Sequence, residues 1–273
     1  MISSKSEIPV VARPRISVCM AAYNGDRYIQ EQIGSILSQL GEHDELFVVD
    51  DASSDRTKER VVEFKDPRIK LIEHNENQGV VETFEEAVRY ATGDILFLSD
   101  GDDIWAPDKV QKVLQAFMIN PQAEIVTTGL KLIDENGLPL DSSDYLKNRR
   151  FTSALLPNLL RNRFQGSTMA FRSSLMPRIL PFPKHKGFLH DAWIGACNGA
   201  TGGHTVYIDE PLLYYRRHAS NFSRRLGLGR QITLRVQLVM ALTGRWLRLR
   251  SGGSPKTIGP GAGSRRKRSP QKP

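Results

Sequence analysis

The stretch ISVCMAAYNGDRYIQEQIGSIL, residues 16–37, decides the fold class of this chain. Residues 16–22 are mostly apolar and predict a buried strand, and the following residues 27–40 predict an amphipathic helix. The residues that face inward on this helix are Ile29, Ile33, Ile36, Leu37 and Leu40. A buried strand followed by such a helix is the repeating unit of an α/β domain.

The same unit repeats further along the chain. Predicted strands lie at residues 45–50, 69–73, 95–99 and 124–128, and predicted helices begin near Ser54, Val80 and Pro107. Strands that alternate with helices form right-handed crossovers, so we expect a mostly parallel, doubly wound sheet with helices on both faces. The alternation fades after Gly129.

Length and composition narrow the class of protein. The chain has 273 residues, of which 40% are hydrophobic and 25% charged, which suits one large globular domain or two small ones. Cys19 and Cys197 belong to no C-x-x-C pair, which argues against a disulfide framework or a cysteine zinc site. Residues 1–14 are expected to be a leader without a signal peptide, and no apolar run approaches about 18 residues. We therefore expect a cytoplasmic protein.

Charge is distributed unevenly along the chain. Residues 211–273 carry 15 Lys and Arg and no Asp or Glu, whereas residues 1–210 carry 23 basic and 30 acidic residues. Residues 223–250 predict a basic amphipathic helix, and residues 251–273 a disordered basic tail. Such a helix is typical of a peripheral protein on an anionic membrane surface, here the inner face of the cell membrane; cover for the body or dimerisation are the alternatives. Stacking aromatics are sparse, so nucleic acid is not an expected partner.

Acidic residues follow several predicted strands at the point where each strand ends. Asp50 and Asp51 end the second strand, and Asp100, Asp102 and Asp103 follow the fourth. The carboxyl ends of parallel strands meet at one edge, where ligands bind. Carboxylates gathered there repel one another, which favours a divalent cation with a nucleotide. Neither G-x-G-x-x-G nor G-x-x-x-x-G-K-[ST] is present, which disfavours dehydrogenases and P-loop proteins.

Several segments in this order resemble family 2 of the inverting, GT-A type glycosyltransferases, and in particular its rhamnosyltransferase-like branch. They are residues 16–37, VVDDASSDRT, HNENQGVVETFEEAV, LSDGDDIWAPDKV and the later GSTMAFR, HDAW and YRRHASN. The resemblance implies that residues 15–130 bind a nucleotide sugar and that residues 131–222 bind the acceptor and carry catalysis. It further implies a UDP- or dTDP-sugar donor, dTDP-rhamnose among them. The implied acceptor is a saccharide, lipid-linked or free, in cell-surface polysaccharide biosynthesis.

The resemblance also implies roles for residues at the nucleotide site. Ala22 and Tyr23 resemble residues that line the nucleotide, and Asp51 resembles the carboxylate that accepts from N3–H of uracil or thymine. Asp100 resembles the ribose or metal contact of a D-x-D motif. Asp102 resembles the direct ligand of Mg²⁺ or Mn²⁺.

Further residues match the catalytic and acceptor parts of the family. Asp191 resembles the base that takes the acceptor proton, and His218 resembles a histidine that completes the metal or diphosphate site. The remaining candidates are Arg216 and Arg217 for the diphosphate and Trp105, Thr168 and Trp193 for the acceptor. Gly101 and Ala192 depart from the larger side chains common in this branch.

Other readings of these residues stay open from sequence alone. Asp51 is also a typical turn former, His218 a typical structural histidine, and Trp105 and Trp193 are equally typical of a core. A nucleotidyltransferase is a rival enzyme class, although residues 22–27 lack the Gly- and Lys/Arg-rich loop that it usually carries. A protein that binds a nucleotide sugar without turnover is the third alternative.

Overall fold

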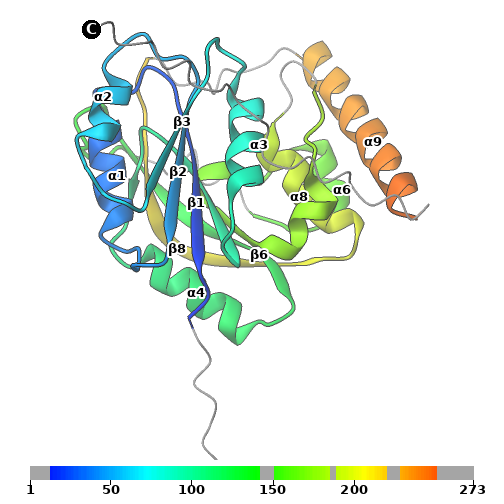
Figure 1. Cartoon of the computed structure of the whole chain (residues 1–273). Coiled ribbons are helices and arrows are strands. Elements are labelled where there is room, and N and C mark those ends of the chain that lie inside the picture. The colour runs from blue at the N-terminus through cyan, green and yellow to red at the C-terminus, as the bar shows by residue number, and fades with distance from the viewer. Residues whose placement is uncertain (1–12, 142–150, 185–188, 220–227, 251–273) are drawn as a thin grey trace, which may run out of the picture.

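The computed structural model describes residues 13–141, 151–184, 189–219 and 228–250 (Figure 1). The strands are β1 (Ile16–Ala22), β2 (Glu45–Asp50), β3 (Ile69–Glu73), β4 (Ile95–Asp100), β5 (Ile104–Trp105), β6 (Ala123–Ile133), β7 (Met169–Arg172) and β8 (His204–Arg216). The α-helices are α1 (Ile29–Leu37), α2 (Thr57–Val62), α3 (Val80–Tyr90), α4 (Lys109–Ile119), α6 (Leu155–Leu160), α7 (Met176–Ile179), α8 (His190–Ala200) and α9 (Leu228–Arg250). Two 3₁₀ turns are η1 (Gly166–Thr168) and η2 (Ser173–Leu175). The alternating strands and helices confirm the predicted α/β class.

The strands of the described residues form one sheet in the order β3-β2-β1-β4-β7-β6-β8-β5. The first four of these are mutually parallel, as predicted. In the other half β7 runs antiparallel to both β4 and β6, β8 is parallel to β6, and β5 is antiparallel to β8. Strand β6 is longer than the predicted 124–128 and passes through the expected subdomain boundary after residue 130. The second predicted subdomain, residues 131–222, therefore continues the same sheet.

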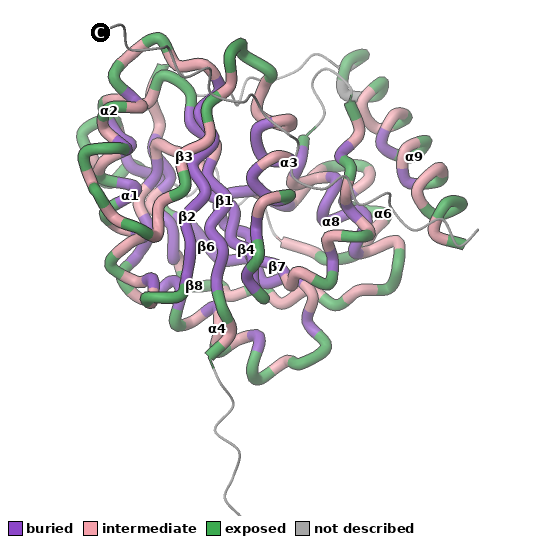
Figure 2. The backbone as a smooth tube through the Cα atoms, viewed as in Figure 1, coloured by how far each residue is buried: buried purple, intermediate pink, exposed green. Residues whose placement is uncertain are grey.

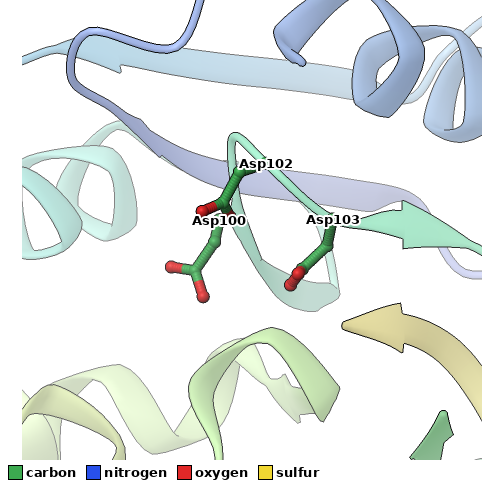
Figure 3. Close-up of side chains that lie close together, drawn as sticks. All are labelled: Asp100, Asp102 and Asp103. Carbon is green, nitrogen blue, oxygen red and sulfur yellow. The ribbon is translucent and has the colours of Figure 1, made fainter. Parts of the chain in front are cut away.

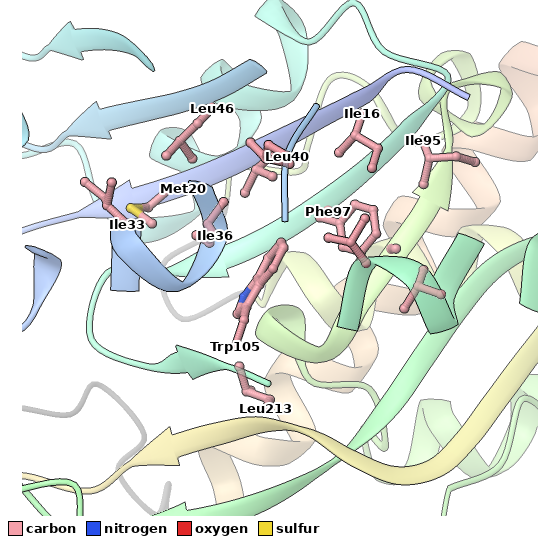
Figure 4. Close-up of a cluster of buried hydrophobic side chains, with 14 of the residues drawn as sticks. Ile16, Met20, Ile33, Ile36, Leu40, Leu46, Ile95, Phe97, Trp105 and Leu213 are labelled. Atoms are coloured by element: carbon pink, nitrogen blue, oxygen red, sulfur yellow. The ribbon is translucent and has the colours of Figure 1, made fainter. Parts of the chain in front are cut away.

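Helices cover both faces of the sheet, and the side chains of β1 point alternately toward the two faces. Ile16, Val18 and Met20 face a core shared with α1 and α4. Figure 4 shows Ile16 and Met20 in this core beside side chains of α1. Cys19 faces the other core, which α3 and α8 cover. The central strands are consequently buried between two helical layers (Figure 2), and Cys19 and Cys197 are both free and buried.

The predicted C-terminal helix forms as α9, which packs beside α8 and α6 (Figure 1). Leu238 and Leu242 join the second core, and the Arg245 guanidinium lies 5.3 Å from the ring centroid of Trp193. Arg245 also donates to the carbonyl of Pro181 at 2.6 Å. One face of α9 therefore covers the body of the protein. No helix within the described ranges is long and apolar enough to cross a membrane.

The loops after β1 and β2 lock together at the carboxyl edge of the sheet. The Asp51 amide donates to the Ala22 carbonyl at 2.9 Å, and the Ser54 amide donates to Asn24 Oδ1 at 2.8 Å. Asn24 and Ala52 have positive φ angles of 48° and 59°. Such backbone strain is commonly found at functional sites, where the surrounding structure maintains it.

Candidate active site

Three carboxylates converge on the turn between β4 and β5. Asp100 ends β4, and Asp102 and Asp103 follow in the turn (Figure 3). One carboxylate oxygen from each lies within 4.8 Å of the others. Burial, together with the charges of Asp102 and Asp191, raises the pKa of Asp100 to about 7. Burial and the same cluster raise the pKa of Asp103 well above its ordinary value. The cluster therefore favours a positive charge that would relieve this repulsion.

The turn that carries Asp102 and Asp103, called the acidic turn below, is held in place by residues at the C-terminal end of β8. His218 Nε2 lies 2.8 Å from Asp102 Oδ2, so these two predicted metal ligands are in contact. The Arg216 amide donates to Asp103 Oδ1 at 3.0 Å, and Arg216 Nε donates to the Asp102 carbonyl at 2.9 Å. Asp103 Oδ2 is buried without a hydrogen-bond partner. Hard oxygen ligands with an unsatisfied buried oxygen fit a divalent cation such as Mg²⁺ or Mn²⁺.

Lys109 is a buried lysine near the acidic cluster, and it was not among the site residues predicted from sequence. Its ammonium group donates to the Ser167 carbonyl at 2.7 Å and lies 4.3 Å from the ring centroid of Trp105. Burial lowers the pKa of Lys109 to about 7, although Asp103 and Asp100 oppose this shift. The available signal was its position in line with Val113 on the apolar face of α4. Lys109 thus anchors the start of α4 to η1, and Asp100 and Asp103 act on its charge.

The predicted nucleotide residues lie at the ends of β1 and β2. Ala22 is buried, whereas the Tyr23 side chain beside it is 55% exposed. Asp51 is buried, and its carboxylate accepts from the amides of Gln78 at 2.7 Å and Gly79 at 2.8 Å. The segment between β3 and α3 therefore wraps around Asp51 and fixes its carboxylate.

Asp191 lies in the first turn of α8 and is half-buried. Its Oδ1 accepts from the Ala192 amide at 2.6 Å. Its charge is one of the causes that raise the pKa of Asp100, so the two carboxylates lie within electrostatic range of each other. The preceding His190 is buried with its ring 4.0 Å from that of Phe84 and without a hydrogen bond to either nitrogen. The predicted base and the predicted metal ligand Asp100 therefore influence each other electrostatically.

The two predicted sugar platforms need correction. Trp105 is 2% exposed and packs 5.4 Å from Phe97, inside the core that Figure 4 shows. Trp193 is 1% exposed, and its Nε1 donates to the Ile179 carbonyl at 2.7 Å. A sugar stacks on an accessible ring face, and both rings are covered. Both tryptophans are core residues that support the site from behind.

Two further predictions of ligand contact are corrected in the same way. Arg216 is buried, and its guanidinium donates to Glu31 Oε2 at 2.6 Å and lies 4.8 Å from the Tyr28 ring centroid. It therefore holds the acidic turn rather than pointing to a diphosphate. The buried Thr168 hydroxyl bonds to the Gln165 carbonyl and to Thr127, each at 2.8 Å. Arg217 is half-buried, and its role in diphosphate binding stays a prediction.

The sequence of this chain matches a known protein family. The profile of the family described as "Glycosyl transferase family 2" matches residues 17–177, more than half of the chain. The chain therefore belongs to glycosyl transferase family 2.

Relatives with known names agree with this assignment. The chain is 32% identical to the UDP-Glc:alpha-D-GlcNAc-diphosphoundecaprenol beta-1,3-glucosyltransferase WfgD of Escherichia coli, over 45% of this chain and 48% of WfgD. It is 27% identical to the uncharacterized glycosyltransferase alr2836 of Nostoc sp., over 76% of this chain and 66% of the relative. The chain therefore spans about half to two thirds of the length of these relatives.

Solved structures show the same fold. The S. aureus TarS 1-349 complex with UDP-GlcNAc matches with a TM-score of 0.66 at 18% identity, covering 85% of this chain and 66% of TarS. The mannosyltransferase PcManGT from Pyrobaculum calidifontis, in complex with GDP-Man and Mn²⁺, matches with a TM-score of 0.58 at 23% identity, covering 90% of this chain and 67% of PcManGT. The GT-A type fold is confirmed, and the rhamnosyltransferase-like branch stays a prediction.

Proposed function

We propose that this chain is a metal-dependent inverting glycosyltransferase that moves a sugar from a UDP- or dTDP-sugar to a saccharide acceptor. The observation that carries the proposal is the acidic cluster of Asp100, Asp102 and Asp103, with Asp191 near enough for its charge to act on Asp100. The cluster and Asp51 lie at the carboxyl edge of the sheet, where α/β proteins bind ligands. The position of these carboxylates supports a cation site and a nucleobase contact at this edge, and Asp191 of α8 is the proposed base.

The residues divide the reaction between them. Asp191 takes the proton of the acceptor hydroxyl while that oxygen bonds to the anomeric carbon, and the bond to the diphosphate breaks on the opposite face. The diphosphate leaves with the electron pair. Asp100, Asp102 and His218 would hold the cation, which when bound would neutralise charge on the leaving diphosphate. Arg216 keeps the acidic turn in position, and Lys109 is held by the Ser167 carbonyl.

The donor and acceptor follow from the site and from the relatives. Asp51 offers an acceptor to a base with a ring N–H, and the names of related proteins include UDP-Glc, UDP-GlcNAc and GDP-Man. WfgD is named for an acceptor linked to diphosphoundecaprenol, which supports a lipid-linked saccharide in cell-surface polysaccharide biosynthesis. The resemblance to the rhamnosyltransferase-like branch makes dTDP-rhamnose the first donor to compare with UDP-sugars.

The direct test is a panel of nucleotide sugars with wild type and Asp191→Asn. UDP-glucose, UDP-galactose, UDP-N-acetylglucosamine, dTDP-rhamnose and GDP-mannose are titrated calorimetrically with and without Mn²⁺, and transfer is then assayed with the donor that binds. We expect Asp191→Asn to bind donor like wild type and to lose transfer. If the chain instead joins the nucleoside monophosphate of UTP or dTTP to a sugar 1-phosphate and releases inorganic pyrophosphate, that would favour a nucleotidyltransferase. Donor binding without any turnover would favour a non-catalytic binding protein.

We further propose that α9 attaches the chain to an anionic membrane surface, on the inner face of the cell membrane. Its inner face packs on the body, but its outer face exposes Ile232, Val236, Val239, Met240, Trp246 and Leu247. Most of these lie three, four or seven positions apart, which places them on one side of the helix. Arg230, Arg248 and Arg250 are exposed on the same helix, which contains no acidic residue. Apolar side chains with arginines suit an anionic leaflet, whereas two such helices would repel each other in a dimer.

Vesicle sedimentation tests this attachment. We expect the full chain to bind vesicles that contain phosphatidylglycerol, and to bind phosphatidylcholine vesicles weakly. The double variant Ile232→Ser with Val236→Ser should lose this binding. The matched control is Met118→Ser with Ile119→Ser, which removes exposed apolar side chains of α4. A concentration-dependent dimer by light scattering, without vesicle binding, would show that α9 docks on a second copy instead.

A further inference from the structure

His74 lies between two carboxylates and is absent from the roles described so far. Its Nδ1 is 2.7 Å from Asp51 Oδ1, and its Nε2 is 2.7 Å from Glu86 Oε2. The His74 side chain is 4% exposed. An ionised carboxylate only accepts hydrogen bonds, so His74 donates to both partners only when both ring nitrogens carry a proton. The geometry therefore describes an imidazolium bridge from α3 to Asp51.

The charge on His74 agrees with its surroundings. Burial alone would lower the pKa of His74, but the hydrogen bonds to Asp51 and Glu86 and the charges of these two groups outweigh it and raise the pKa. Charge-assisted hydrogen bonds of this kind are shorter and stronger than neutral ones. The Glu86 end of the bridge is 31% exposed, and the Asp51 end is 5% exposed. His74 thus ties a buried carboxylate to one nearer the surface.

The hydrogen bonds to Asp51 leave little of its capacity free. Oδ1 accepts from His74 and from the Gln78 amide, and Oδ2 accepts from the Gly79 amide. An ionised carboxylate has about four acceptor positions, so these three bonds leave one, on Oδ2. Gly79 has a φ of 99°, which an L side chain rarely adopts, so the turn that aims these amides depends on glycine. The carboxylate is therefore fixed in orientation and reduced to a single acceptor.

We propose that His74 is a positioning residue for nucleobase recognition, which holds Asp51 so that it reads one ring N–H and thereby selects uracil or thymine. Guanine presents N1–H and an exocyclic amine side by side, and a carboxylate pairs with both only when each oxygen has a free position. Cytosine has no ring N–H to donate. The imide N3–H of uracil or thymine needs one acceptor, which is what Asp51 retains. This inference rests on the proposed function, because it assumes that Asp51 contacts the base.

The test is calorimetric titration of UDP, dTDP, GDP and CDP, in Mn²⁺, against the full chain. For wild type we expect UDP and dTDP to bind at least about tenfold more tightly than GDP or CDP. His74→Ala should weaken UDP binding about tenfold. His74→Asn should stay within about threefold of wild type, because its amide nitrogen lies near the position of Nδ1 and can still donate to Asp51. The control His43→Gln changes an exposed histidine just before β2, at the opposite end of that strand.

A second readout separates positioning from a structural role. With the donor that binds best, His74→Ala should raise KM for the donor about tenfold while kcat and the stabilisation by Mn²⁺ change less than threefold. A general structural defect would lower donor affinity, kcat and the stabilisation by Mn²⁺ together, and His74→Asn would then fail like His74→Ala. Three results would overturn the inference. They are the pattern of a general structural defect, unchanged UDP binding in His74→Ala, and GDP binding to wild type as tightly as UDP. The absence of binding by any nucleotide to wild type would instead count against the proposed function.

Discussion

Replacing Asp102 by alanine should remove most of the stabilisation of this protein by divalent cations. Asp102 supplies one of three carboxylates that gather within 4.8 Å, and it is also the partner of His218. The affinity of such a site for a hard cation depends on how many charged oxygen ligands it offers. Loss of Asp102 removes one charge and leaves His218 without this carboxylate.

The magnitude follows from linkage between binding and folding. A cation present at about 100 times its dissociation constant stabilises the folded state by about 2.7 kcal/mol, and a hundredfold weaker site would leave about 0.4 kcal/mol. For a domain of this size 1 kcal/mol corresponds to a shift of roughly 2–4 °C in Tm. Wild type should therefore gain about 5–10 °C with Mn²⁺, and Asp102→Ala about 1–2 °C.

The assay is thermal unfolding of metal-free protein with increasing Mn²⁺ or Mg²⁺. Glu42→Gln is the matched control, because it removes one exposed negative charge just before β2, away from the acidic cluster. Without metal, Asp102→Ala should unfold within about 1 kcal/mol of wild type, since Asp102 contributes to the repulsion that raises the pKa values of Asp100 and Asp103. Equal stabilisation of Asp102→Ala and wild type by Mn²⁺ would refute the reasoning.

Three further outcomes are expected. Asp191→Asn should lower kcat by about 10²–10⁴ while the donor Kd, measured calorimetrically, changes less than about twofold, because only the proton acceptor is lost; a rate near wild type would exclude Asp191 as the base. The raised pKa of His74 means that its contribution to stability is present below pH of about 6.5 and is lost as the pH rises through the folded-state pKa. Urea unfolding across this range should show the decline in wild type and a smaller one in His74→Asn, and parallel curves would contradict it. Gly195→Ala would place a methyl group 2.3 Å from the buried ring of Phe164, and should cost about 1–3 kcal/mol in the same assay.

Much of the structure of residues 15–130 was predictable because each element depends on its own local sequence. The bounds of β1, β2 and β3 match the predicted strands, and α3 begins at the predicted Val80. A buried parallel strand has a short run of apolar residues, and a surface helix has apolar residues along one face. Each element can therefore be predicted from its own stretch of sequence. The carboxyl ends of such strands share an edge, which is why Asp51 and the acidic cluster were found together.

The second half was less predictable because its strands pair out of sequence order. Strand β7 enters the sheet between β4 and β6 and runs antiparallel to both. It has four residues, which is too short for a clear period, and its neighbours lie far away in sequence. For the same reason the exposure of Trp105 and Trp193 could not be predicted: a tryptophan of the core and one that stacks on a sugar look alike in sequence.

The sequence by itself therefore determined the α/β class, the parallel half of the sheet and which edge carries the acidic side chains, since these follow from apolar period and from the ends of strands. It also placed Asp191 and His218 among the candidates through their motifs. Only the tertiary structure decided that His74 bridges Asp51 and Glu86, that Lys109 is buried and donates to Ser167, and that Arg216 supports the acidic turn. These roles depend on contacts between residues far apart in the chain, and no local pattern encodes such contacts.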